Sequence, residues 1–111
     1  MEKEKLMAAG IDYENALRRF AGKESLYEKY LVQFKEDNHL ELALEARERN
    51  NYDEMLKAIH TMKGVVGTLG MTALFQACSG VVTAIRAEKL EQVDELVESV
   101  KEEYAKVMAI L

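Results

Sequence analysis

A histidine, a lysine and two glycines follow one another at helical spacing in IHTMKGVVGTLGMTAL, residues 59–74. Lys63 and Gly64 lie one turn after His60 and Gly67 lies two turns after it, so all four belong to one side of a helix. A neutral imidazole is a nucleophile, and a histidine with the ordinary pKa of about 6.5 is mostly neutral near pH 7. The lysine adds positive charge, and the glycines remove side chains at a cost of about 1 kcal/mol each in mid-helix. This pattern predicts an exposed nucleophile that meets a large, anionic group carried by another protein.

The helix that carries this row is expected from about Asp53 to Leu69, with Asp53 as its N-cap and Gly70 as its C-terminal cap. Its buried face is an apolar stripe with spacings of four and three residues: Met55, Ile59, Met62, Val66 and Leu69. His60 lies one residue round from that stripe. Glycines that only bring helices close would be expected on the stripe, whereas these two lie on the row of the histidine. We therefore interpret both glycines as clearing the surface beside His60.

The rest of the sequence has the same helical periodicity, and no segment has the alternation of a strand. Further helices are expected over about residues 12–22, 23–35, 40–49 and 90–110, and another from near Thr72 that includes Ile85, with the first ten residues linker-like. The breaks between them are short, which makes neighbouring helices antiparallel. The sequence therefore predicts an all-α fold: an antiparallel up-down four-helix bundle with extra short helices at the N-terminus. With 111 residues we expect one domain, of which residues 1–10 form an N-terminal extension.

Composition limits the partners. Twenty acidic residues against fifteen basic ones give a net charge of -5, which would repel a phosphate backbone, so nucleic acid is a poor candidate. No apolar run is long enough for a signal peptide or a membrane span, so we expect a cytoplasmic protein without direct membrane contact. Cys78 is the only cysteine and lies on an apolar helix face, which favours an inert buried thiol. Nothing in the pattern requires a dimer, so a monomer is expected.

Other chemistry finds little support. A di-iron site in a helical bundle needs two Glu-x-x-His motifs, and the chain offers one, Glu36 with His39, because Lys57 stands three residues before His60. His39 is most simply a polar residue at a helix boundary. The chain has no phosphate-binding glycine loop and no nucleotide-binding fingerprint. No metal, no cofactor and no autonomous enzyme activity is expected.

The segment 59–74 resembles the signature of histidine-containing phosphotransfer (HPt) domains, which have a histidine followed by Lys at +3, Gly at +4, and Gly at +10 before a Leu. Upstream, GIDYENALRRFAGKESLYEKYLVQF (residues 10–34) is similar to the N-terminal helices of bacterial members. One departure is Val81-Val82, where many relatives carry Leu-Glu. That position is remote from the row of His60.

The resemblance implies a phosphorelay carrier of a two-component system. His60 would accept a phosphoryl group from the aspartyl phosphate of a receiver domain and pass it to another receiver's aspartate. Lys63 would stabilise the phosphoryl group. The implied partners are response-regulator receiver domains and a hybrid sensor histidine kinase, with Mg²⁺ supplied on the partner receiver. The partner would dock over Leu56, Thr61, Gly64 and Gly67.

Two alternatives stay open at this point. One is a helical adaptor that binds receiver or kinase domains without carrying phosphate. The other concerns the kind of protein to which this domain belongs, because the sequence is equally compatible with a free-standing relay protein, a module of a hybrid kinase, and the phosphoacceptor domain of a chemotaxis-type kinase. The presence of both His60 and Lys63 favours the carrier over the adaptor.

Overall fold

The computed structural model describes residues 2–111, and every regular element in that range is helical. In chain order the elements are α1 (Lys3–Ala8), α2 (Tyr13–Arg19), α3 (Glu24–Gln33), the 3₁₀ turn η1 (Phe34–Glu36), α4 (His39–Glu48), α5 (Tyr52–Thr68), α6 (Thr72–Arg86), the 3₁₀ turn η2 (Leu90–Gln92) and α7 (Val93–Met108). The prediction of an all-α fold is confirmed. None of the described helices is long and apolar enough to cross a membrane.

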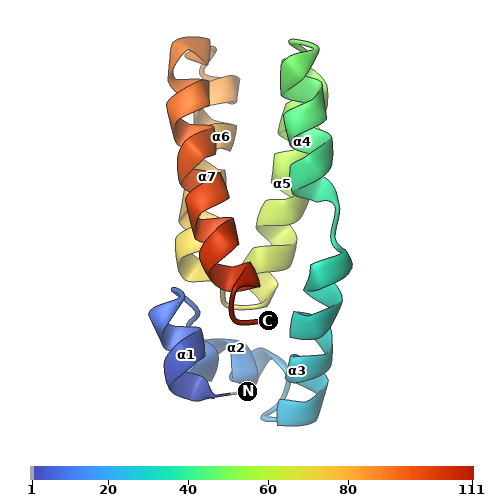
Figure 1. Ribbon diagram of the computed structural model, residues 1–111, viewed down its shortest axis with the longest axis vertical. Helices are drawn as coiled ribbons and strands as arrows, with labels where there is room; N and C mark the ends of the chain where they lie inside the picture. The colour runs from blue at the N-terminus through green and yellow to red at the C-terminus, as the bar shows by residue number, and fades with distance from the viewer. Residues whose placement is uncertain (1) are drawn as a thin grey trace.

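The long helices pack in chain order, α4 on α5, α5 on α6 and α6 on α7, and run along the long axis of the molecule (Figure 1). Side chains of α7 also contact α4 and the 3₁₀ turn η1 that precedes it. The Arg47 guanidinium lies 3.7 Å from the Asp94 carboxylate, and the rings of Phe34 and Tyr104 have centroids 6.0 Å apart. The turn between α5 and α6 lies at the same end of the molecule as α1 and α2, as Figure 1 shows.

The apolar stripe of α5 is buried as its spacing predicted, with exposed fractions of 4% or less at Met55, Ile59, Met62, Val66 and Leu69. The predicted N-cap of this helix is wrong. Asn51, not Asp53, is the N-cap, and its side-chain oxygen accepts a hydrogen bond of 3.1 Å from the backbone N–H of Glu54. Asn50 has a φ of 55°, a left-handed conformation that asparagine tolerates, and this reverses the chain early enough for Asn51 to cap. Asp53 lies in the first turn, where a carboxylate interacts favourably with the helix dipole.

The prediction that the first ten residues are linker-like is also wrong. Residues 3–8 form α1, and Leu6 and Ile11 are buried at 1% and 2% exposure. The backbone of this segment is bonded to the turn after α5, since Asp12 donates to the carbonyl of Gly70 at 2.7 Å and Ala73 donates to that of Gly10 at 3.3 Å. A few apolar residues among lysines and glutamates are enough to anchor a short helix when a core is available next to it. Met1 lies outside the described residues.

Gly70 terminates α5 as predicted, and the structure gives two reasons for a glycine. Its φ is 75°, and a Cβ there would lie 2.6 Å from the Cβ of Ala16 and 2.8 Å from the carbonyl oxygen of Asp12. L side chains rarely adopt this φ. A Cβ would also clash with Ala16 of α2 and with Asp12, the N-cap residue of α2. The same end is held by Tyr27 of α3, which is fully buried and donates its O–H to the carbonyl of Leu69 at 2.7 Å.

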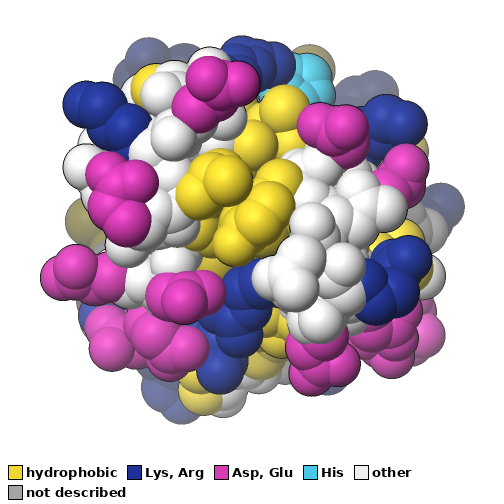
Figure 2. All heavy atoms as spheres, turned by 90° about the horizontal axis from the view of Figure 1, so that it is seen from above, with side chains coloured by type: hydrophobic (Ala, Val, Ile, Leu, Met, Phe, Trp, Pro, Cys, Tyr) yellow, Lys and Arg dark blue, Asp and Glu magenta, His cyan; other side chains and the backbone are white. Residues whose placement is uncertain are grey.

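The opposite end of the molecule carries the connections α4–α5 and α6–α7. Figure 2 looks onto this end and shows hydrophobic side chains together in its middle, with charged side chains of both signs around them. The short N-terminal helices cover only the other end (Figure 1). Additional helices therefore cover one end of the core and not the other, and the turn after α5 lies at the covered end.

Candidate functional site

His60 lies in the middle of α5 with its side chain exposed, directly after the buried Ile59. No hydrogen bond or ion pair occupies its imidazole among residues 2–111. The helix therefore presents the ring to solvent, where a group carried by another molecule can reach it. The prediction of an exposed histidine one step round from the buried stripe is confirmed.

Lys63, one turn after His60, is half-buried. Its ammonium nitrogen lies 5.4 Å from the centroid of the Phe75 ring, on α6, which is the distance of a cation–π contact. The two flanking positions of the predicted docking surface are accessible. Leu56 is half-buried, and Thr61 is exposed and donates its hydroxyl to the carbonyl of Lys57 at 3.0 Å.

The two glycines of the row differ. A Cβ on Gly64 would have no atom within 4 Å, so this position is open to solvent. A Cβ on Gly67 would lie 3.0 and 3.1 Å from Cδ2 and Cε2 of Phe75. The interpretation that both glycines clear the surface therefore holds for Gly64 and not for Gly67, whose missing side chain is replaced by the ring of Phe75. Helical spacing places a residue on a face but does not show which neighbour approaches that face.

Two hollows flank α5 beside this row. The larger, of about 820 Å³, lies between α3 and α5. Half of its lining residues are apolar, namely Phe20, Leu26, Tyr30, Phe34, Val65 and Leu69, and the others are Gln33, Glu36, Asp37, Thr61, Gly64 and Thr68. The smaller, of about 580 Å³, lies towards α2 and α6 and is lined by Asp12, Asn15, Arg19, Lys63, Gly64, Gly67, Thr68, Gly70, Thr72 and Phe75. Gly64 and Thr68 belong to both linings. The exposed side of α5 is thus a ridge between the two hollows, and Gly64 makes it low.

The apolar hollow depends on residues of α3 that the core does not cover. Leu26 and Tyr30 belong to the apolar face of α3, but their exposed fractions are 36% and 44%, while Tyr27 and Leu31 are fully buried. The apolar arc of α3 is therefore wider than the core requires. That excess width was the signal in the sequence, since an arc wider than the buried stripe leaves apolar side chains for a partner.

Arg19 is a residue of this region that the sequence did not reveal. Its guanidinium donates to the carbonyl of Gly67 at 2.6 Å and is 3.4 Å from the carbonyl oxygen of Thr68. These carbonyls belong to the last turn of α5, where a cation interacts favourably with the helix dipole. Arg19 thus joins α2 to the end of the row that starts at His60, over 48 residues of sequence.

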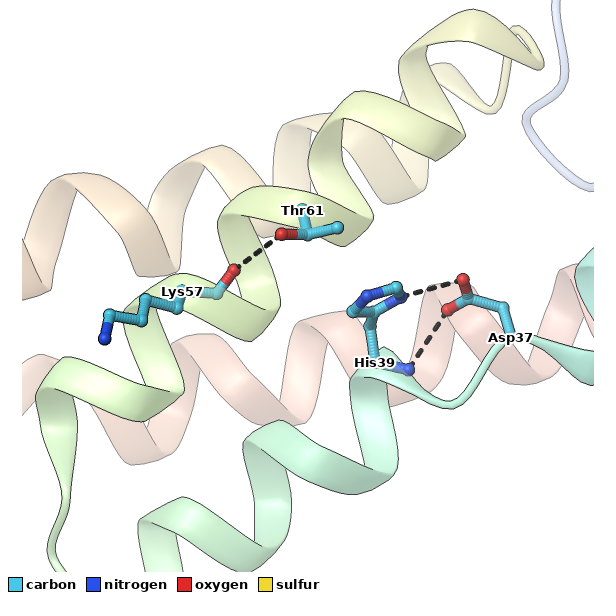
Figure 3. A network of polar contacts seen from close by, with 4 residues as sticks. All are labelled: Asp37, His39, Lys57 and Thr61. Carbon is cyan, nitrogen blue, oxygen red and sulfur yellow. Dashed lines mark hydrogen bonds and ion pairs between the residues drawn. The ribbon is translucent and has the colours of Figure 1, made fainter.

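The second histidine of the chain has a different environment. Nδ1 of His39 lies 2.8 Å from the Asp37 carboxylate, whose other oxygen accepts the backbone N–H of His39 at 3.1 Å. Figure 3 shows its ring on the side of α4 that faces α5, where Thr61 lies. The ring is held by a local carboxylate at the start of a helix, as expected for a boundary residue. Among residues 2–111 no three His, Cys, Asp or Glu side chains form a group that could hold a metal ion.

Cys78 lies on α6 with no exposed surface. Burial raises the pKa of its thiol from 9.0 to about 12, and the positive charge of Lys63 opposes that rise. The thiol is therefore protonated near neutral pH, and the prediction of an inert, buried cysteine agrees with this environment.

A comparison with known protein families finds a match to the part of the chain that contains this site. A family model described as "Hpt domain" matches residues 29–110, which includes α4 to α7 and the whole row from His60 to Gly67. Residues 10–28, where the sequence also resembles bacterial members, lie outside the match. Comparisons with curated proteins and with solved structures found no match.

Proposed function

Because the chain belongs to the Hpt domain family, whose members carry out histidine phosphotransfer in phosphorelay signalling, we propose that His60 is its phosphoacceptor. The observation that carries this proposal is the row on α5: an exposed histidine, a half-buried lysine one turn on, and an open Gly64 beside it. The other histidine, His39, is held by Asp37. His60 is therefore the better nucleophile for a large partner.

On the side of this protein, the bond-forming step needs only the unprotonated imidazole of His60. The lone pair of the unprotonated imidazole nitrogen attacks the phosphorus of an aspartyl phosphate, and an N–P bond forms. The P–O bond to the aspartate breaks and its electron pair returns to the carboxylate. The other ring nitrogen keeps its proton, so the imidazole becomes a phosphorylated imidazolium. Transfer to a second receiver reverses these steps, and no external acid or base is needed.

Lys63 would stabilise the negative charge that the phosphoryl oxygens carry during and after transfer. A lysine has a flexible four-carbon stem, so its ammonium can follow the phosphoryl group as it moves. Mg²⁺ and the acidic residues of the reaction would come from the partner receiver. The protein is in this proposal a phosphoryl carrier rather than an autonomous enzyme, and the site is completed only when the partner docks.

The partner surface we propose is the ridge of α5 together with the apolar hollow beside it. Leu56, Thr61 and Gly64 would lie under the partner around His60. Leu26 and Tyr30 would provide apolar contact area next to the ridge, because exposed apolar side chains in a hollow gain most from being covered. Such a surface suits a receiver domain, whose aspartyl phosphate must come within bonding distance of His60.

Several further features belong to the same proposal. The helices α4 to α7 would act as an antiparallel up-down four-helix platform for the site. The protein would work as a monomer in the cytoplasm, as part of a two-component system that includes a hybrid sensor histidine kinase. The packing order of the helices supports the platform, and the family supports the role in a two-component system.

The test is transfer from a phosphorylated receiver domain to the purified protein, with radiolabelled phosphate. We expect the label to be acid-labile, base-stable and absent from His60→Gln, while His39→Gln, the matched control, keeps it. Thermal melts should show that His60→Gln folds, since His60 is exposed and makes no side-chain hydrogen bond among the described residues, and the same melts verify the fold of His39→Gln. Label that persists in His60→Gln would contradict the carrier function. A receiver that binds the protein without any label transfer would support the adaptor instead.

A further inference from the structure

The ammonium of Lys63 has an aromatic partner. Nζ lies 5.4 Å from the centroid of the Phe75 ring, and no carboxylate among residues 2–111 forms an ion pair with it. A cation above an aromatic ring is attracted by the negative charge of the ring face. The ring of Phe75 is therefore the electrostatic partner that the structure gives to the lysine of the site.

The position of that ring depends on Gly67. Cδ2 and Cε2 of Phe75 lie 3.0 and 3.1 Å from where a Cβ of residue 67 would be, so the edge of the ring fills the place of the missing side chain. Gly67 lies one turn after Lys63, whereas His60 lies one turn before it. Seven residues of helix correspond to about 10 Å along the axis. Phe75 therefore draws the ammonium of Lys63 towards the end of α5 that is away from His60.

Two other observations place the ammonium beside α6. Lys63 and Phe75 line the smaller hollow together with Gly67, and His60 is not among its lining residues. Burial raises the pKa of Cys78, one turn beyond Phe75 on α6, and the charge of Lys63 lowers it, so the ammonium lies close enough to α6 to act on that thiol. The lysine of the site thus lies beside α6 in the unmodified protein.

We propose that Phe75 holds the Lys63 ammonium away from His60 while His60 is unmodified, and that a phosphoryl group on His60 draws the ammonium off the ring. This inference rests on the proposed phosphoacceptor role of His60. A phosphoryl group carries between one and two negative charges and accepts charge-assisted hydrogen bonds, which are stronger than an exposed cation–π contact. The lysine stem is long and flexible, so the ammonium can change partner without any movement of the helix.

The consequence is a bias in the phosphotransfer equilibrium. Phe75 stabilises only the unmodified form, because the phosphorylated form has given up the contact, and a contact made in one state alone shifts the population towards that state. The strength of an exposed cation–π contact corresponds to a shift of about 2- to 5-fold. Phe75 would therefore lower the fraction of phosphorylated His60 at equilibrium with a receiver and make the carrier a more ready donor.

The first experiment needs no partner protein. The Hε protons of Lys63 should show an upfield ring-current shift in the NMR spectrum of the unmodified protein, and Phe75→Leu should remove it. Phosphorylation of the wild-type protein with phosphoramidate, with ³¹P NMR to verify phosphohistidine, should move the Lys63 resonances to their position in Phe75→Leu. Resonances without a ring-current shift in the unmodified protein, or with an unchanged shift after phosphorylation, would overturn the inference.

The second experiment measures the equilibrium ratio of phosphohistidine to phospho-receiver, with the receiver identified in the His60 assay. Phe75→Leu should raise this ratio about 2- to 5-fold, whereas Phe75→Tyr, which keeps an aromatic ring, should have the wild-type ratio. In a protein that already carries Lys63→Ala, Phe75→Leu should have no effect on the ratio. A fall in the ratio, or the same rise without Lys63, would refute the proposal. If no receiver transfers phosphate to His60, the carrier function fails, and the NMR experiment still decides whether Phe75 holds Lys63.

Discussion

Gly64 allows the sharpest test of the docking surface, because its substitution should separate stability from function. A Cβ at this position meets no atom within 4 Å, so Gly64→Ala adds a methyl group to open solvent. Alanine is a better helix former than glycine by up to about 1 kcal/mol. The variant should therefore be as stable as the wild type or more stable, with a Tm higher by up to about 4 °C. Gly64→Gln should fold equally well, because its side chain also points to solvent.

The other two glycines of the segment are matched controls with different environments. Gly70→Ala forces a residue with a Cβ into a φ of 75° and places that Cβ 2.8 Å from the carbonyl oxygen of Asp12, which should cost about 2–4 kcal/mol. Gly67→Ala brings a Cβ within 3.0 Å of the ring of Phe75, which can rotate, so its effect should be smaller. The expected order of stability is Gly64→Ala first, Gly67→Ala second and Gly70→Ala last.

The effects of these substitutions on phosphotransfer should not follow their order of stability. Gly64→Gln raises the ridge between the two hollows and should block transfer from a receiver domain, while Gly64→Ala should reduce it less. Phosphoramidate is small and should still label His60 in Gly64→Gln at the wild-type rate, which separates docking from chemistry. Thermal melts and transfer kinetics on the same proteins decide the question. If Gly64→Ala is as unstable as Gly70→Ala, Gly64 packs against a neighbouring helix. If Gly64→Gln folds and transfers phosphate at the wild-type rate, no partner covers residue 64.

Two further outcomes are expected. Lys63→Ala should slow transfer from a receiver by about 10-fold or more, about 1.4 kcal/mol in the barrier, with little change in the thermal melt, and an unchanged rate would make Lys63 an ordinary surface charge. Raising the pH from 9 to 12 should lower the free energy of unfolding, because burial raises the pKa of Cys78 from 9.0 and of Tyr27 from 10.0 to about 12, so the unfolded chain loses these protons first. Denaturant titrations across this range should show a smaller decline for Cys78→Ala, and an equal decline would contradict the role of the thiol.

The sequence was sufficient for the long helices, though not for α1, and for the exposure of His60, because both depend on local periodicity. A repeat of four and three apolar residues determines which side of α5 is buried, and a histidine one step away is then exposed whatever the helix packs against. Gly70 could be predicted as a helix end for a similar reason, since a left-handed residue after a helix is a local requirement. The position of the N-cap could not be predicted, because Asn51 and Asp53 are both favourable N-cap residues. The left-handed conformation of Asn50 determines that Asn51 is the N-cap.

Only the tertiary structure decided what surrounds the row. The spacing of Gly67 equals that of a surface-clearing glycine, but the ring that fills its place comes from α6. The partner of Lys63 and the cation at the end of α5 come from α6 and α2, through Phe75 and Arg19. The exposure of Tyr30 depends on how much of α3 the other helices cover. Periodicity describes one helix at a time, whereas these contacts depend on where the helices cross, and the crossing follows from the shapes of all the packed side chains together.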